Sequence, residues 1–417
     1  MPVSAEDCAR LDAADAAMGT FARLRACFAP GEADTRYFDA NSIGPMPADV
    51  PARMAELLDA GWRRARRRGW TEMDWLAQPR ALGASLAPIL GAAAEDVVVG
   101  ESTSVNQYRM LRLGLRLKAP RRTLVLERDV FPTNRYVAQG IAQSGDAALR
   151  LLSRVDEPTL AQALAPGDVA VVALSLVDYR SSERHDIARI TAQVQDAGAM
   201  VLWDLSHAAG AVSVGLRAAG ADMALGCGYK YLCGGPGAPG FVYLHPRWQE
   251  DAPSSICGWM GHADPFVFEP EFRPAPGMAR WLVGTPSVLA NAAFSAAASI
   301  WRDVDVAWLD ARHRSLTDAL IRLLETQCAG FGLALASPRR HSQRGGHVAV
   351  RFAHAAALAQ ALGERGVVVS ARKPDALRFG VHPLVHSHTD LWHAVAILRD
   401  LLEAETWRDP RFQGSAI

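Results

Sequence analysis

The sequence predicts an α/β protein with a large, mainly parallel seven-stranded sheet and a smaller carboxyl-terminal α/β domain. From about residue 90 onward, short apolar runs alternate with longer helical patterns, which is typical of a parallel sheet covered by helices on both faces. After about residue 290 a long helical pattern precedes a few more short strands. The chain has 417 residues, more than one compact core usually contains, so two domains are expected.

Seven apolar runs supply the strands of the large sheet, at 96–99, 123–126, 149–152, 169–174, 199–203, 223–225 and 241–244. Helical patterns lie between several of them, at 105–117, 134–144 and 187–197. Ligands of such sheets bind beyond the carboxyl ends of the strands. Phe131, Ser175, Asp204 and the residues after Gly100 all fall there.

The second domain begins with a single helical pattern over 291–328. Two or three strands follow, from 347–352, 367–370 and 377–381, with helices at 355–365 and 390–403. We expect residues 1–45 to pack with this small domain, 46–290 to form the large domain and 291–417 the small one.

Composition narrows the function classes. Lys plus Arg and Asp plus Glu number 44 each, so the net charge of +0 gives no bulk argument for nucleic-acid or anionic-membrane binding. Small molecules or a second copy of the chain are the expected partners. No apolar stretch reaches membrane-spanning length, and residues 1–18 lack the pattern of a signal peptide. Six scattered cysteines fit reduced thiols, which predicts a cytoplasmic protein.

Lys230 and Asp204 form the most informative pair in the sequence. Lys230 closes the segment 226–230, and Asp204 ends the apolar run 199–203. A lysine amine forms an imine with the aldehyde of pyridoxal phosphate, and a carboxylate can keep its pyridine nitrogen protonated. Either residue alone is more often a surface charge or a turn residue. Together and in this order, they predict a pyridoxal phosphate site.

The segment 100–106, Gly-Glu-Ser-Thr-Ser-Val-Asn, follows a strand and opens a helix. Hydroxyl groups and free backbone N–H groups at a helix amino end are a suitable seat for a phosphate. Ordinary capping by Ser or Thr is the alternative. With Lys230 on the same sheet, we favour the phosphate.

Three other patterns are interpreted without a ligand. The glycines of 235–240 match a dinucleotide fingerprint, but they precede a strand and two prolines remove N–H donors, so we predict a turn into an edge strand. The arginine run 63–68 is typical of a solvated helix end. His382, His386 and His388 are interpreted as loop histidines, and no metal site is predicted.

The residues 204–244, DLSHAAGAVSVGLRAAGADMALGCGYKYLCGGPGAPGFVYL, strongly resemble the kynureninase family of fold-type I pyridoxal phosphate enzymes, in the class V aminotransferase group. Other segments agree in order: FDANSIG at 38–44, STSVN at 102–106, FPT at 131–133, GWMGH at 258–262, GTPSVL at 284–289 and RFGVHPL at 378–384. The resemblance thus extends over most of the chain. It implies hydrolysis of L-kynurenine, or a close analogue, to anthranilate and L-alanine.

The resemblance also implies roles for individual residues. Lys230, Tyr229 and Asp204 would be catalytic: the Schiff-base lysine, a proton shuttle and the partner of the pyridinium. The cofactor would be held by Thr103, Ser104, Phe131, Thr133, Asn134, Asp204, His207, Tyr229, Lys230, Trp259 and Thr285. The substrate would contact Asn41, Ser42, Trp70 and Arg378, with Arg378 clamping its carboxylate. Trp259 and Thr285 would come from a neighbouring subunit, which implies a homodimer with shared active sites.

Four positions depart from the family pattern. Asn134 replaces an Asp, Asp178 an Asn, Val385 an aromatic residue and Ala40 a Gly. The first two change charge close to the expected ring and leave open an alternative: a kynureninase-like enzyme with another amino-acid substrate, acting as an aminotransferase, β-lyase or cysteine desulfurase. A desulfurase needs an exposed cysteine near the substrate, whereas Cys328 ends a helical pattern. A non-catalytic, cofactor-bound sensor is disfavoured because no DNA-binding module is fused to the chain.

Overall fold

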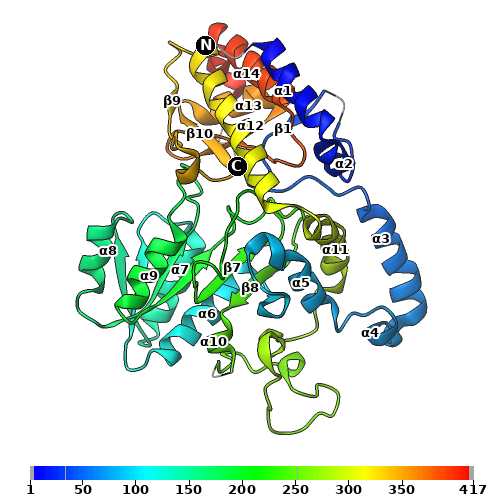
Figure 1. The fold of residues 1–417 in the computed structure, drawn as a ribbon, viewed down its shortest axis with the longest axis vertical. Helices are drawn as coiled ribbons and strands as arrows, with labels where there is room; N and C mark the ends of the chain where they lie inside the picture. The colour runs from blue at the N-terminus through cyan, green and yellow to red at the C-terminus, as the bar shows by residue number, and fades with distance from the viewer. Residues whose placement is uncertain (1–3, 33, 251, 413–417) are drawn as a thin grey trace.

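The structure, a computed structural model, describes residues 4–32, 34–250 and 252–412. Figure 1 shows two lobes, with the large sheet and its helices in the lower one and the carboxyl-terminal elements in the upper one. The predicted α/β fold, with a large seven-stranded sheet and a second domain, is confirmed.

The large sheet has the strand order β2-β8-β7-β6-β5-β3-β4. Its strands are β2 (Val97–Val99), β3 (Thr123–Glu127), β4 (Ala148–Leu152), β5 (Val169–Ser175), β6 (Met200–Asp204), β7 (Met223–Cys227) and β8 (Gly240–Leu244). The neighbouring pairs β4–β3, β3–β5, β5–β6 and β6–β7 are all parallel. The carboxyl ends of these strands therefore meet at one edge of the sheet, as the sequence predicts.

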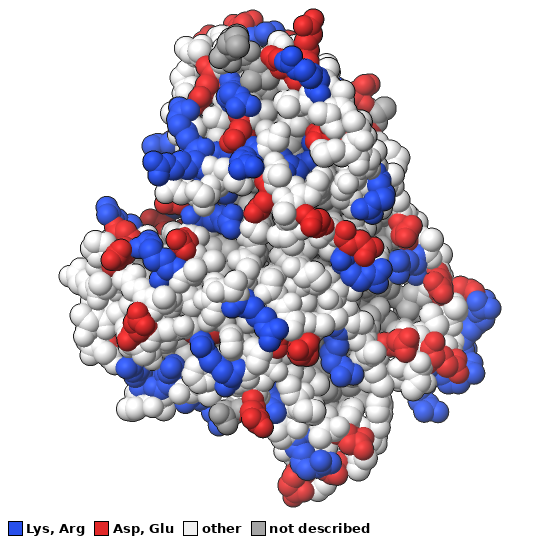
Figure 2. All heavy atoms as spheres, viewed as in Figure 1, with Lys and Arg blue, Asp and Glu red and all other residues white. Residues whose placement is uncertain are grey.

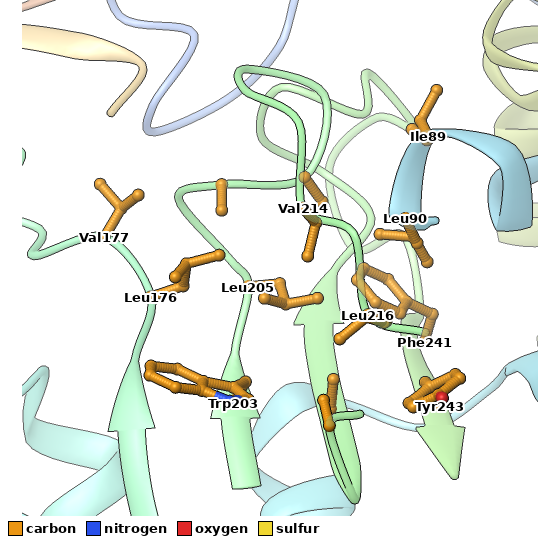
Figure 3. Close-up of a cluster of buried hydrophobic side chains, with 14 of the residues drawn as sticks. Ile89, Leu90, Leu176, Val177, Trp203, Leu205, Val214, Leu216, Phe241 and Tyr243 are labelled. Atoms are coloured by element: carbon orange, nitrogen blue, oxygen red, sulfur yellow. The ribbon is translucent and has the colours of Figure 1, made fainter. Parts of the chain in front are cut away.

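Both faces of the sheet are covered by helices. Alternate strand residues such as Val201 and Trp203 join one core with α5 (Gln78–Leu90), α8 (Glu157–Leu164), α9 (Ile187–Asp196) and α11 (Val288–Arg302). Met200 and Leu202 point to the other core, with α6 (Thr103–Leu117) and α7 (Pro132–Gln143). Figure 3 shows Trp203 and Tyr243 at one level of the first core, with Leu205 and Leu216 nearby.

The prediction that residues 241–244 form an edge strand is wrong. β8 lies between β2 and β7 and is antiparallel to both, so it runs opposite to the other six strands. All five of its residues are buried. β2 (Val97–Val99), which comes about 140 residues earlier in the chain, pairs with its outer side, and a pattern of glycines and prolines before β8 does not reveal this pairing.

The small domain contains more strands than predicted. A four-stranded sheet has the order β12-β13-β10-β9, from β9 (Ala334–Leu335), β10 (His347–Arg351), β12 (Ser370–Arg372) and β13 (Ala376–Gly380), and β1 (Arg36–Tyr37) pairs with β11 (Val367–Val368). The helices are α12 (Val306–Gln327), α13 (Ala355–Glu364) and α14 (His388–Glu403). Two-residue strands are too short to give an alternating pattern.

The helical pattern predicted over 291–328 is two helices. α11 ends at Arg302, and α12 begins after Asp305, whose side chain accepts a hydrogen bond from the Trp308 N–H at 2.6 Å. α11 contacts α5 and α3 (Val50–Glu56), so it packs with the large sheet. The domain division at residue 290 stays a prediction, and this packing favours a division near residues 303–305.

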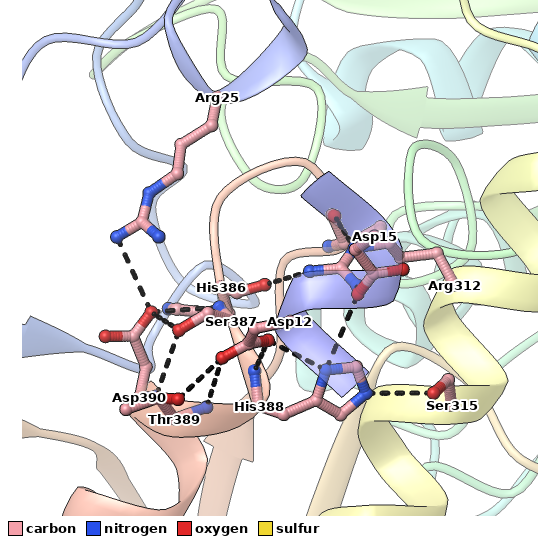
Figure 4. A network of polar contacts seen from close by, with 11 residues as sticks. Asp12, Asp15, Arg25, Arg312, Ser315, His386, Ser387, His388, Thr389 and Asp390 are labelled. Carbon is pink, nitrogen blue, oxygen red and sulfur yellow. Dashed lines mark hydrogen bonds and ion pairs between the residues drawn. The ribbon is translucent and has the colours of Figure 1, made fainter. Parts of the chain in front are cut away.

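The amino-terminal helix α1 (Ala5–Ala17) contacts α14 (Figure 4). The Asp12 carboxylate accepts hydrogen bonds from the backbone N–H groups of His388 and Thr389, at 2.7 and 2.9 Å. Asp15 pairs with the buried Arg312. His388 therefore lies in the first turn of a helix and in an ion-pair network, and its interpretation as a loop histidine is wrong.

His382 and His386 are buried and hydrogen-bonded: His382 to the carbonyl of Tyr231 at 3.0 Å and His386 to that of Tyr37 at 2.8 Å. They join the amino-terminal segment and the lysine loop to the small domain. In the part of the chain that the structure describes, no helix is long and apolar enough to cross a membrane. On the face seen in Figure 2, basic and acidic side chains are intermixed over both lobes.

Candidate active site

A cavity of about 510 Å³ opens at the carboxyl ends of the parallel strands. Ten of the residues expected to act on the cofactor line it: Thr103, Ser104, Phe131, Thr133, Asn134, Asp204, His207, Tyr229, Lys230 and Thr285. They come from five separate parts of the sequence, and the sheet topology brings them together.

Lys230 lies in the loop after β7, with its side chain directed at His207. Its Nζ is 2.9 Å from His207 Nε2 and 5.6 Å from the centre of the Phe131 ring. Burial holds the pKa of His207 well below its usual range, and the neighbouring Lys230 charge adds to this shift. His207 is therefore a neutral imidazole at pH 7 that can accept a proton or a hydrogen bond from the lysine.

Asp204 ends β6 and is held on both carboxylate oxygens. Asn134 Nδ2 donates to Oδ2 at 2.8 Å, and the backbone N–H of Ser206 donates to Oδ1 at 2.9 Å. The backbone of Asn134 is held in turn, because Gln107 Nε2 donates to the Asn134 backbone carbonyl oxygen at 2.8 Å. The substitution of Asp by Asn thus supplies a donor to Asp204, where a second ionised carboxylate would repel it.

The phosphate seat predicted at 100–106 has the expected geometry. β2 ends at Val99, and α6 begins at Thr103. Ser102 is the capping residue, since its Oγ accepts from the Val105 N–H at 3.3 Å, and phosphate binding by the neighbouring Thr103 and Ser104 stays a prediction. Ser104 Oγ and Thr133 Oγ1 lie 2.6 Å apart, and the amino ends of α6 and α7 therefore present hydroxyl groups side by side.

Tyr229 precedes the lysine and lines the same cavity. Burial raises the pKa of its phenol above the usual value, and Cys227 contributes to the rise. The phenol is therefore protonated at neutral pH and can donate a proton or a hydrogen bond. Its backbone carbonyl accepts from the Gly44 N–H at 2.8 Å, which ties the amino-terminal segment to the lysine loop.

Arg378, Asn41 and Ser42 come together at the junction of the two lobes. Arg378 is 1% exposed, and its Nη1 donates to the carbonyl oxygen of Tyr179 at 2.5 Å. Ser42 Oγ lies 3.4 Å from Nη2, and the Asn41 side-chain oxygen, in its favoured orientation, accepts from Nη2 at 3.3 Å. Burial, with Arg372 nearby, lowers the pKa of Arg378 to about 10, so it stays charged at pH 7.

No carboxylate among the described residues forms an ion pair with Arg378. Its hydrogen-bond partners are neutral oxygens of Tyr179, Ser370 and Ser42. Asp39 is near enough to favour the charged form of Arg378 but forms no ion pair with it. A buried cation without a carboxylate in direct contact is costly unless a ligand supplies the charge. Tyr179 also lines the cavity, which places this guanidinium next to the site.

Trp70 and Trp259 do not line the cavity of their own chain. Their rings lie 6.3 Å apart and belong to an aromatic cluster with Trp75 and Phe266. Trp259 is 37% exposed, and the segment around it projects from the large lobe in Figure 1. Thr285, which we expected from a neighbouring subunit, instead lines the cavity of its own chain.

Sequence reasoning missed three residues at the site. Tyr179 stacks edge-on against Phe131, with ring centres 5.4 Å apart. Arg372 reaches Ser42 Oγ at 3.4 Å. The His347 ring lies 5.9 Å from that of His207. Only Tyr179 had a usable signal, because it lies shortly after the carboxyl end of β5, the end of the sheet at which Asp204 closes β6.

Asp178, the other departure in charge, does not line the cavity. Its Oδ1 accepts from the backbone N–H groups of Arg180 and Ser181, at 3.1 and 2.7 Å, so it builds a turn.

The other residues that line the cavity have the chemistry needed to hold pyridoxal phosphate. An amine, a fixed carboxylate, a ring face and hydroxyl groups at two helix ends surround one cavity, and the buried Asn134 Oδ1 has no partner.

Comparison with known proteins agrees with this geometry. The family of the kynureninase C-terminal domain matches residues 309–398. A kynureninase from Deinococcus radiodurans is 44% identical over 412 residues, covering 95% of this chain and 97% of that protein. A kynureninase from Burkholderia mallei is 41% identical over 382 residues, covering 90% of this chain and 91% of that protein.

Solved structures show the same fold at lower identity. A cysteine desulfurase from Escherichia coli superposes with a TM-score of 0.74 at 19% identity, over 92% of this chain and 98% of that one. A cystine C-S lyase in complex with cysteine persulfide gives 0.75 at 18%, over 89% and 99%. With relatives above 40% identity over nearly its whole length, the chain belongs to the kynureninase family.

Proposed function

We propose that this protein hydrolyses the Cβ–Cγ bond of L-kynurenine, or of a close analogue, to give anthranilate and L-alanine with pyridoxal phosphate as its cofactor. The observation that carries the proposal is one cavity in which Lys230, Asp204 and Tyr229 surround the same space, beside a buried, unpaired Arg378. Membership of the kynureninase family supports the substrate.

The residues have distinct tasks around the cofactor. The hydroxyls of Thr103, Ser104 and Thr133 would hold its phosphate, Phe131 would cover a ring face, and Asp204 would accept from the ring nitrogen. When bound to Lys230, the cofactor supplies an electron-accepting ring that stabilises negative charge on the amino acid. Asn134 keeps the Asp204 carboxylate oriented for this contact.

The positive charge of Arg378 would position the substrate through its α-carboxylate. Arg378 presents a guanidinium whose partners are neutral, so the α-carboxylate of an amino acid supplies the missing negative charge. Asn41 and Ser42 border that guanidinium and would share the carboxylate. Lys230 then lies within reach to take the α-proton, and Tyr229, protonated at pH 7, can donate one.

A homodimer with shared active sites completes the proposal. Trp70 and Trp259 lie outside the cavity of their own chain, on a projecting, partly exposed aromatic cluster. Phe266 and Phe268 on the same segment are 44% and 74% exposed, an apolar surface that a second copy would cover. A cytoplasmic location also stays a prediction.

No observation favours the alternative chemistries. Cysteine desulfuration needs an accessible thiol, whereas Cys328 is 3% exposed and burial raises its pKa to about 12. None of the residues that line the cavity is a cysteine.

Anthranilate fluorescence after addition of L-kynurenine tests the activity, and sulfide release from L-cysteine tests the rival. The chain has only three lysines, Lys118, Lys230 and Lys373, so the cofactor lysine can be found directly. After borohydride reduction, mass spectrometry should find the adduct on the peptide of Lys230. Lys230→Ala should lose both the adduct and the visible absorbance, and the exposed Lys373→Ala should keep them. An adduct elsewhere would refute the assignment.

A further inference from the structure

Two buried histidines face each other across the junction of the lobes. His207 follows β6 in the large domain, and His347 begins β10 in the small one. Their ring centres are 5.9 Å apart, and the ring planes are inclined by 63°. His347 is fully buried, and His207 is 7% exposed. Neither the family motifs nor the proposed chemistry assigns a role to His347.

The hydrogen-bond partners of the two rings indicate which nitrogen of each ring carries the proton. His207 Nε2 lies 2.9 Å from Lys230 Nζ, so a lysine N–H donates to Nε2 and the proton of the neutral ring sits on Nδ1. His347 Nε2 lies 3.4 Å from the carbonyl oxygen of Arg180, which can only accept, so its proton sits on Nε2. The two remaining nitrogens, both Nδ1, are buried without a partner, and one is a donor and the other an acceptor.

Both rings are neutral at pH 7. Burial holds the pKa of His207 well below its usual range, with Lys230 as the next cause, and burial does the same for His347, with Arg378 next. A neutral imidazole can accept a proton on one nitrogen while it releases the proton on the other. Such a pair passes a proton on without storing charge in the interior.

The proposed reaction, on which this inference rests, requires a route for a proton. Water adds its hydroxyl to the ketone carbon of the substrate and its hydrogen to the β-carbon, which yields an aromatic carboxylic acid and alanine. At neutral pH the carboxylic acid ionises, so each turnover releases one proton. That proton leaves either through the opening of the cavity or through groups in the cavity wall.

We propose that His207 and His347 form a proton relay between Lys230 and the turn that contains Arg180. The Lys230 Nζ–H bond breaks as the His207 Nε2–H bond forms, and His207 Nδ1 passes its proton to His347 Nδ1. His347 is buried and its Nε2 faces the carbonyl oxygen of Arg180, so a water molecule at the turn 178–184 would take the Nε2 proton to solvent, beside the partly exposed Arg180. A second water would bridge the two Nδ1 atoms, and rotation of each ring restores the starting tautomers.

Chemical rescue provides the test. His347→Ala should lower anthranilate formation about tenfold or more, with cofactor absorbance per subunit unchanged, and added imidazole should restore it. Pyrrole has the same size but no acceptor nitrogen, so it should fill the space without restoring activity. His313→Ala is the matched control, because His313 is also a fully buried imidazole but lies outside the proposed path.

A second variant and a second assay keep the test decisive if the first variant folds poorly. His347→Gln retains a donor and an acceptor but cannot relay, and it should show the same loss. Exchange of the α-hydrogen of L-alanine with D₂O requires Lys230 to exchange protons with solvent but needs no kynurenine cleavage, and both variants should slow it. A wild-type protein that exchanges alanine without forming anthranilate would refute the proposed function alone. Exchange within twofold of wild type in both variants, or equal rescue by pyrrole, would overturn the relay.

Discussion

Asn134→Asp should make the stability of the protein depend on pH in a way that the wild type does not. In the structure the amide Nδ2 of Asn134 donates to Asp204 Oδ2 at 2.8 Å, and the Asn134 side chain is 4% exposed. The substitution places a second carboxyl at this distance. Two ionised carboxylates so close repel each other, so the pair retains one proton to a higher pH than an isolated Asp does.

The magnitude follows from the shift. A buried carboxyl pair of this kind raises the pKa of the introduced group by about 1–3 units. Each unit is about 1.4 kcal/mol, so the expected loss is about 1.4–4 kcal/mol at full ionisation. Because the folded pKa is raised above the unfolded value, the variant matches the wild type at low pH and loses stability as the pH rises through the raised pKa. At pH 5 the protonated carboxyl can still donate to Asp204.

Urea unfolding of the cofactor-free protein at pH 5 and pH 8 measures this difference. Asn134→Leu is the matched control, because it removes the donor without adding a charge and should lose about 1–2 kcal/mol at both pH values. Pyridoxal phosphate should narrow the deficit of Asn134→Asp at pH 8, since its protonated ring nitrogen adds a positive charge. An equal deficit at both pH values would refute the interpretation of Asn134 as a neutral donor to the Asp204 carboxylate.

Three further substitutions test other parts of the site. Gly44→Ala places a Cβ 2.2 Å from the backbone oxygen of Lys230, so it should cost about 1–3 kcal/mol in urea unfolding, while Gly31→Ala, with nothing within 4 Å, should change little; equal effects would contradict the close approach. Burial, with Asp178 next, raises the pKa of Glu127 to about 7, so Glu127→Gln should stabilise the protein by about 3 kcal/mol at pH 8 and hardly at all at pH 4, where the wild-type carboxyl is protonated; a gain that does not depend on pH would count against the shift. Arg378→Lys should raise KM for kynurenine at least tenfold with little change in cofactor affinity, because a lysine cannot grip a carboxylate in two places; an unchanged KM would place the carboxylate elsewhere.

Most of the large sheet was predictable because strands such as β2, β3 and β5 are buried apolar runs, and helices of clear periodicity separate several of the strands. Asp204 and Lys230 were predictable because their chemistry is tied to positions after particular strands. The break between α11 and α12 was not, since three residues at 303–305 interrupt the pattern for less than one helical turn.

The partners of the site residues were harder to predict. Nothing in the sequence around His347 indicates that its ring lies 5.9 Å from that of His207, because the two residues are 140 positions apart and meet only when the lobes pack. Asn134 was recognised as a departure from the family, but its effect depends on a hydrogen bond across 70 residues of sequence. Contacts between side chains distant in the sequence carry no local pattern.

The contact between α1 and α14 affects where the chain can be shortened. Asp12 is the group that satisfies the first free amides of α14, and Asp15 neutralises Arg312, which is 3% exposed. Trimming the chain past residue 15 would remove the carboxylate that pairs with Arg312 and the acceptor for the N–H groups of His388 and Thr389, both in the small domain that also supplies Arg378. An affinity tag placed before Ser4, which is exposed, leaves this attachment intact, whereas removal of the leading helix as a dispensable tail would damage the small domain.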